Sequence, residues 1–66
     1  MTIKTSKGNI TASKELFNIM SVYLSEASDS FKKTGYNAFS LEAEELAQQI
    51  YKTLDSTGYY NKVKPL

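Results

Sequence analysis

The chain has 66 residues, a mass of 7.4 kDa and a formal net charge of +1, which limits it to one small domain, 1–66. It contains no Cys, His, Arg or Trp. Thiolate and imidazole ligands, the commonest general base and the guanidinium fork for phosphate are therefore all missing. We expect a protein that is not an enzyme and has no catalytic residue, metal site or cofactor. The near-neutral charge and polar N-terminus predict a cytoplasmic protein that binds no membrane.

The first twelve residues, 1–12, are polar. Apolar and polar residues alternate only weakly over 2–5, and the Lys-Gly-Asn sequence at 7–9 is typical of a turn. A short strand and a flexible arm both fit this pattern, and we favour the arm.

An amphipathic helix is predicted over 13–34, because apolar residues recur there at steps of three and four and share one face. Ser13 or Thr11 can cap its start through a side-chain hydroxyl. The apolar stripe consists of Leu16, Met20, Tyr23, Leu24, Ala27 and Phe31. The opposite, polar side carries Lys14, Asn18, Ser21, Ser25, Ser28, Asp29 and Lys32.

A second amphipathic helix is predicted over 38–57, and either Asn37 or Ser40 can be its N-cap. Its apolar stripe consists of Phe39, Ala43, Leu46, Ala47, Ile50, Tyr51 and Leu54. Three acidic residues in its first turn suit the helix dipole, and we interpret them as a solvated face rather than as a cation site. They are Glu42, Glu44 and Glu45.

Both predicted helices end in the sequence Thr-Gly-Tyr, with glycines at Gly35 and Gly58. Glycine favours the left-handed conformation that closes many helices, so both glycines are expected at positive φ. The short connection makes the two helices antiparallel neighbours, and 58–66 is left as a tail. The predicted fold class is therefore all-α: an antiparallel helical hairpin of two amphipathic helices with a polar N-terminal arm.

Two helices alone enclose too little apolar surface for a stable core, and the chain has no disulfide to compensate. We therefore expect a homodimer that completes a four-helix bundle, with Val22 widening the apolar arc of the first helix. In the rival arrangement the arm folds over the helices with Ile3 and Ile10 as lids, and leaves a monomer or a surface for a different protein. The candidate interface residues are Ile19, Val22, Tyr23, Tyr36, Phe39 and Tyr60, the last expected to be free of other contacts.

These features predict a small regulator, inhibitor or adaptor that acts through protein–protein interaction with itself or an unidentified partner. The alternative is a weak nucleic-acid binder resembling a helix-turn-helix, which would use the lysines near both termini. Those candidate anion contacts are Lys4, Lys7, Lys62 and Lys64. Three glutamates at the start of the second helix would face phosphates in that case, which argues against nucleic acid.

Overall fold

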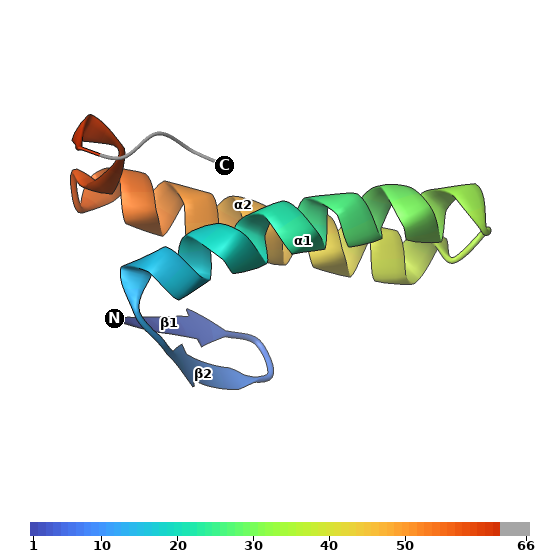
Figure 1. Ribbon diagram of the computed structural model, residues 1–66. Coiled ribbons are helices and arrows are strands. Elements are labelled where there is room, and N and C mark those ends of the chain that lie inside the picture. The colour runs from blue at the N-terminus through green and yellow to red at the C-terminus, as the bar shows by residue number, and fades with distance from the viewer. Residues whose placement is uncertain (63–66) are drawn as a thin grey trace.

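The structure is a computed structural model that describes residues 1–62. It contains two antiparallel helices and a two-stranded sheet beneath one end of them (Figure 1). The predicted helical hairpin is confirmed, but the all-α class was incomplete, because residues expected to form an arm form the sheet. The elements are β1 (Thr2–Thr5), β2 (Gly8–Thr11), α1 (Lys14–Lys33), α2 (Asn37–Ser56) and the 3-10 turn η1 (Tyr59–Asn61).

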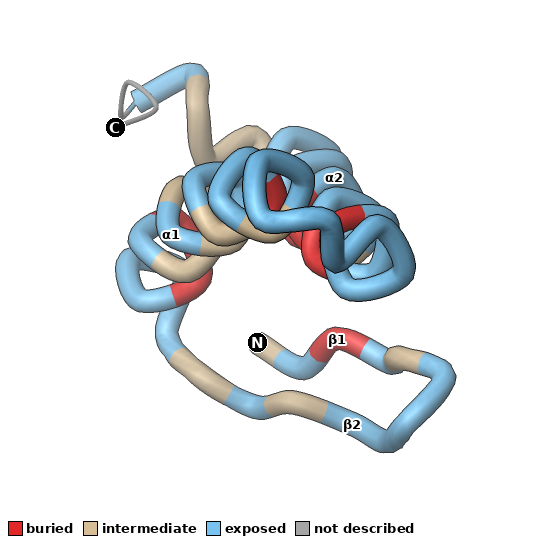
Figure 2. The backbone as a smooth tube through the Cα atoms, turned by 90° about the vertical axis from the view of Figure 1, so that its right-hand side faces the viewer, coloured by how far each residue is buried: buried red, intermediate tan, exposed pale blue. Residues whose placement is uncertain are grey.

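The N-terminal segment is a β-hairpin in which Ile3 pairs with Ile10. Side chains alternate across a strand, so both isoleucines share one sheet face while Thr2 and Lys4 point to the other. Ile3 is only 3% exposed and joins the core. β1 lies nearer to the helices than β2 (Figure 2). The rival arrangement, with Ile3 and Ile10 covering the helices, therefore describes this segment better than the flexible arm.

The two ends of α1 match the predictions made from the sequence. Ser13 is the N-cap, and its hydroxyl accepts a hydrogen bond from the Leu16 amide at 3.1 Å. At the other end the Tyr36 amide donates to the Phe31 carbonyl at 2.8 Å, as expected for a helix closed by a left-handed residue. Gly35 has φ 86° there, and the corresponding Gly58 after α2 has φ 78°. Both predicted positive φ angles are confirmed.

The start of α2 differs from both predicted alternatives. The helix begins at Asn37 with Tyr36 as N-cap, and no side chain caps it. Ser40 lies inside the helix, where its hydroxyl has another partner. The three glutamates therefore fall beyond the first turn, so the helix dipole stabilises them less than expected.

The contact between α1 and α2 combines the large buried side chains of Phe17, Ile50 and Leu54 with several small or polar ones. Several residues assigned to the polar side of the first helix are buried in it, which corrects the predicted orientation of α1. Small residues let the helix backbones approach closely, so α1 is turned away from its apolar stripe. The buried small or polar residues are Asn18, Ser21, Ser28, Ser40, Ala43 and Ala47.

Two serines join the helices near the α1–α2 connection. The Ser28 hydroxyl donates to the Ser40 carbonyl at 2.9 Å, and the Ser40 hydroxyl donates to the Ser28 carbonyl at 2.9 Å. The bonds are reciprocal and buried, so each hydroxyl has a partner despite its loss of water. These two hydrogen bonds fix the register of α1 against α2.

The residues after α2 pack against the helices as far as the structure describes them. Tyr60 donates a hydrogen bond to Asn18 Oδ1 at 3.0 Å and stacks on Tyr51, with ring centroids 5.1 Å apart. The prediction that Tyr60 is free was therefore wrong. Its partner Asn18 is distant in sequence, and no local pattern marks it.

The contacts of Tyr60 predict a pH-dependent stability. Burial, and then the neighbouring Tyr51, raise the pKa of Tyr60 above its ordinary value, while Ser21 opposes the shift. A raised pKa means that the folded state favours the protonated phenol. Its contribution to stability is present below pH 10 and is lost as the pH rises through the raised pKa.

Urea unfolding between neutral pH and pH 11 tests this effect. We expect wild-type stability to fall more steeply above about pH 10 than that of Tyr60→Phe, which cannot ionise. Tyr60→Phe also loses the hydrogen bond to Asn18, so its stability at neutral pH should be lower by about 1 kcal/mol. Parallel pH profiles for the two proteins would contradict the assignment.

Candidate interaction surface

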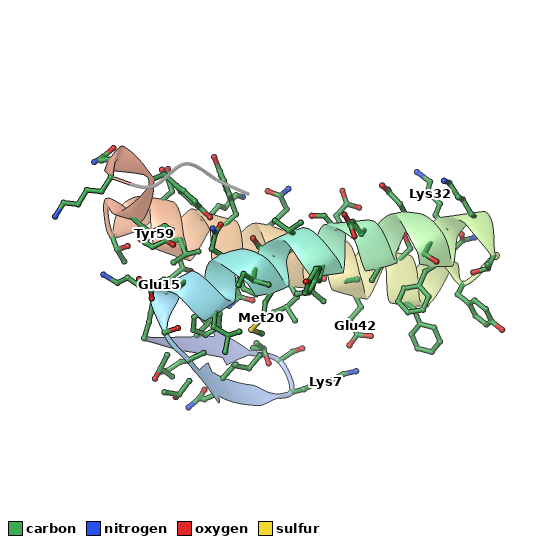
Figure 3. The ribbon with its side chains drawn as sticks, viewed as in Figure 1. Lys7, Glu15, Met20, Lys32, Glu42 and Tyr59 are labelled. Atoms are coloured by element: carbon green, nitrogen blue, oxygen red, sulfur yellow. The ribbon has the colours of Figure 1, made fainter. Side chains whose placement is uncertain are left out.

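One side of α2 faces the β-hairpin. The Gln49 side chain donates to the Lys4 carbonyl, and Lys7 forms an ion pair with Glu42. Figure 3 shows Lys7 and Glu42 pointing toward each other. Phe39 precedes Glu42 by three residues, so it lies on the same side of the helix, one turn closer to the α1–α2 connection.

The corresponding side of α1 is marked by Met20, which points toward the sheet (Figure 3) and packs against the core cluster that contains Ile3. Tyr23, Ala27 and Phe31 follow Met20 at steps of three or four, so they continue this side toward the end of the helix. The two helices thus present one shared face, of which the sheet covers one end.

At the other end three aromatic rings gather. The Phe31 and Phe39 ring centroids are 5.6 Å apart, and Tyr36 lies 6.4 Å from Phe31 and 6.0 Å from Phe39. Tyr36 and Phe39 are 56% and 55% exposed, and Tyr23 is 66% exposed. We call this uncovered part of the helix pair the open face; it consists of Tyr23, Ala27, Phe31, Tyr36 and Phe39.

The sheet and the open face form a step. The sheet projects from the side of the helix pair at the end where α1 begins, and the helices continue beyond it to the α1–α2 connection (Figure 1). Viewed along the helices, the strands stand apart as a separate layer (Figure 2). Among residues 1–62, the other half of this face has no second layer.

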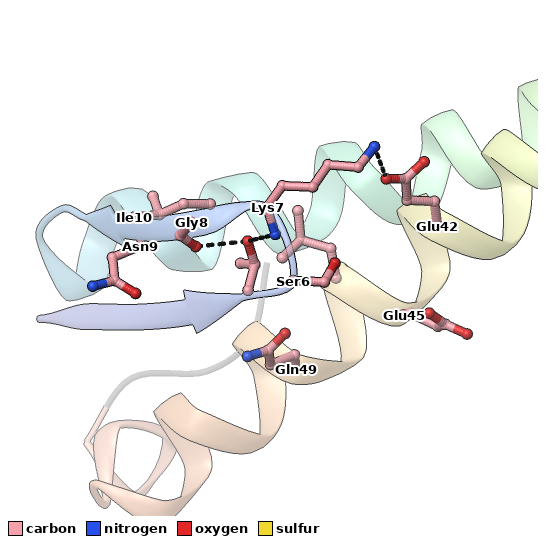
Figure 4. Close-up of a pocket in the computed structure, with 10 residues that line it drawn as sticks. Ser6, Lys7, Gly8, Asn9, Ile10, Glu42, Glu45 and Gln49 are labelled. Carbon is pink, nitrogen blue, oxygen red and sulfur yellow. Dashed lines mark hydrogen bonds and ion pairs between the residues drawn. The ribbon is translucent and has the colours of Figure 1, made fainter.

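A cleft of about 370 Å³ separates the β-hairpin turn from α2 (Figure 4). The turn is ordered by Thr5, whose hydroxyl donates to the Gly8 carbonyl at 2.7 Å and accepts from the Lys7 amide at 3.2 Å. Lys7 reaches across to Glu42, and Glu45 lines the cleft. These contacts hold the hairpin against α2 at the border of the open face.

Of the six predicted interface residues, the structure brings Tyr36 and Phe39 into contact with each other. Tyr23, Tyr36 and Phe39 belong to the open face, and Ile19 precedes Tyr23 by one turn. Phe31, which the sequence assigned to the core, joins them.

Val22 and Tyr60 do not belong to this surface. Both line a separate pocket with Asn18 and Tyr51. Figure 1 shows η1 on the side of the helix pair away from the sheet. Val22 therefore widens a different face of α1, and the predicted interface divides into two surfaces.

The candidate anion contacts lie on different elements of the structure. Lys4 and Lys7 belong to the β-hairpin, and Lys7 is paired with Glu42. Lys62 follows η1, while Lys64 lies outside the described residues.

Within residues 1–62 there is no group of three or more acidic side chains that could hold a metal ion. Neither α1 nor α2 has the length and apolarity needed to cross a bilayer. Comparisons with protein-family models, with curated proteins and with solved structures gave no match.

Proposed function

We propose that this chain is a small non-enzymatic protein that acts as a regulator, inhibitor or adaptor. It would do so by binding a protein, either a second copy of itself or a different partner, through its open face. The observation that carries the proposal is the exposure of the large aromatic side chains Tyr23, Tyr36 and Phe39, which helix periodicity and ring contacts assign to one side of the helix pair. Contiguous apolar surface on a small protein commonly marks an interaction site. Aromatic residues are enriched at such sites.

The internal packing of the hairpin supports this proposal. The contact between α1 and α2 uses serine and alanine, such as Ser28 and Ala47, while Phe39 stays more than half exposed. The core of the hairpin buries Phe17, Ile50 and Leu54, and it leaves the ring of Phe39 available for a contact outside the chain.

The arrangement of the rings also favours binding. Phe31, Tyr36 and Phe39 contact one another, so their conformations are restricted before a partner arrives. Restricted side chains lose less entropy on association. The ion pair of Lys7 and Glu42 lies at the border, in the position of the polar rim found around many interfaces.

Nucleic-acid binding receives less support. It depends on lysines near the two termini, and the pairing of Lys7 with Glu42 reduces their combined charge.

Site-specific crosslinking in the native cells tests the proposed function. A photoreactive phenylalanine analogue at Phe39 is expected to form protein adducts. The same analogue at Leu41 is the matched control, because Leu41 is 60% exposed but lies on the outer side of α2 with Glu44 and Gln48. Equal adducts at both positions, or none at Phe39, would overturn the proposal.

A further inference from the structure

We infer that the occupant of the open face is a second copy of this chain, docked antiparallel across a twofold axis. The inference rests on the proposed function, because it names the partner for the same surface. The resulting assembly would place the helix pairs of two protomers face to face as a four-helix bundle.

The first argument is the amount of exposed surface. The chain has an accessible surface of 4828 Å², whereas the scaling law for folded monomers of its mass gives about 4200 Å². Its Cα radius of gyration is 12.2 Å, against about 10.8 Å for a compact chain of this length. The chain therefore exposes about 600 Å² more surface than a compact monomer of its mass, and the exposed rings of the open face are part of that surface.

The second argument is shape. The sheet projects from one half of the shared face and leaves the other half recessed (Figure 1). In an antiparallel pair the two recessed halves meet, and each sheet lies beyond the tip of the partner's helices. A parallel pair would set sheet against sheet and hold the open faces apart. The step therefore selects the antiparallel arrangement.

The third argument is charge. In a twofold interface the same patch contributes both sides, so a charged centre would face its own charge. The open face has no charged member: it consists of Tyr23, Ala27, Phe31, Tyr36 and Phe39. The ion pair at its border, Lys7 with Glu42, is internally balanced. A second copy presents the same neutral rings, so two open faces can meet without placing like charges at the centre of the interface.

Sedimentation equilibrium of the full chain over a range of concentrations tests this inference. We expect the wild type to approach twice 7.4 kDa. Phe39→Lys should raise the dimer dissociation constant by about 30-fold or more, as for a central aromatic contact. Tyr23→Lys, on the other helix, should act in the same direction. Leu41→Lys introduces the same charge on the outer side of α2 and should leave the dissociation constant unchanged.

Circular dichroism serves as the folding control. Phe39 and Tyr23 are more than half exposed, so both variants should keep the helical spectrum of the wild type. A monomeric wild type at high micromolar concentration would overturn the inference. So would a dimer that Leu41→Lys weakens and Phe39→Lys does not.

The two proposals fail separately. If the purified chain is monomeric but the analogue at Phe39 crosslinks to a different protein, self-association is wrong and the interaction function stands. If every adduct formed at Phe39 in cells is with a second copy of this chain, self-association stands without a further partner. If Phe39 forms no adduct in cells, both proposals fail.

Discussion

Phe17→Ala is expected to lower the free energy of unfolding by about 3–5 kcal/mol, the range for a buried phenylalanine. The Phe17 side chain is fully buried and packs in the cluster with Ile3, Ile50 and Leu54. A single core in a chain of this size supplies only about 3–5 kcal/mol of net stability. The variant should therefore be largely unfolded, which circular dichroism during urea titration will show.

Leu41→Ala is the control for this prediction. Leu41 is an exposed apolar residue of α2, and its truncation should cost less than about 0.5 kcal/mol. Leu46→Ala, at a half-buried position beside the core, should fall between the two. Similar losses for Phe17→Ala and Leu41→Ala would show that the core is elsewhere.

The sequence predicts both helices and their endings well, because these depend on local chemistry. The Ser13 hydroxyl and the conformational freedom of Gly35 act within a few residues of their own positions. The start of α2 was less predictable. Asn37 and Ser40 are both good caps, but the buried Ser40 hydroxyl bonds to the Ser28 carbonyl twelve residues away.

The orientation of α1 could not be obtained from periodicity alone. Hydrophobic spacing places Tyr23 at the centre of the buried stripe, whereas the structure buries Ser21 and Ser28 and exposes Tyr23. Close approach of two helices favours small side chains. Ser21 and Ser28, seven residues apart, were a signal for this contact with the small residues Ala43 and Ala47. A search for apolar periodicity overlooks this signal, because it counts serine as a polar, solvent-facing residue.

Some residues of the open face were named as candidates from the sequence and others were missed, because periodicity alone does not give the orientation of α1. Tyr36 lies in a recognisable turn, while Phe39 belongs to the apolar stripe predicted for the second helix, and the structure leaves both more than half exposed. The rotation of α1 adds Phe31 to them. Tyr60 was misassigned because its partner, Asn18, is 42 residues away and sits among residues that look solvent-facing.

The β-hairpin gives the second large expected effect. A two-stranded hairpin is marginally stable by itself in water, so its order depends on contact with the helices. Ile3 provides that contact, since it is almost fully buried among Phe17, Ile50 and Leu54. Ile3→Ala should therefore lower the free energy of unfolding by about 2–5 kcal/mol. It should also accelerate amide exchange throughout residues 1–12.

Thr2→Ala is the matched control, because Thr2 precedes Ile3 in the same strand but is exposed, and its hydroxyl shares a hydrogen bond of 2.8 Å with the Thr11 hydroxyl. Its cost should stay near 0.5 kcal/mol. A flexible arm would make the two substitutions indistinguishable, with neither changing the urea midpoint. A docked sheet makes Ile3 part of the single cooperative core, so the loss must appear in the helical signal as well as in the exchange of the strands.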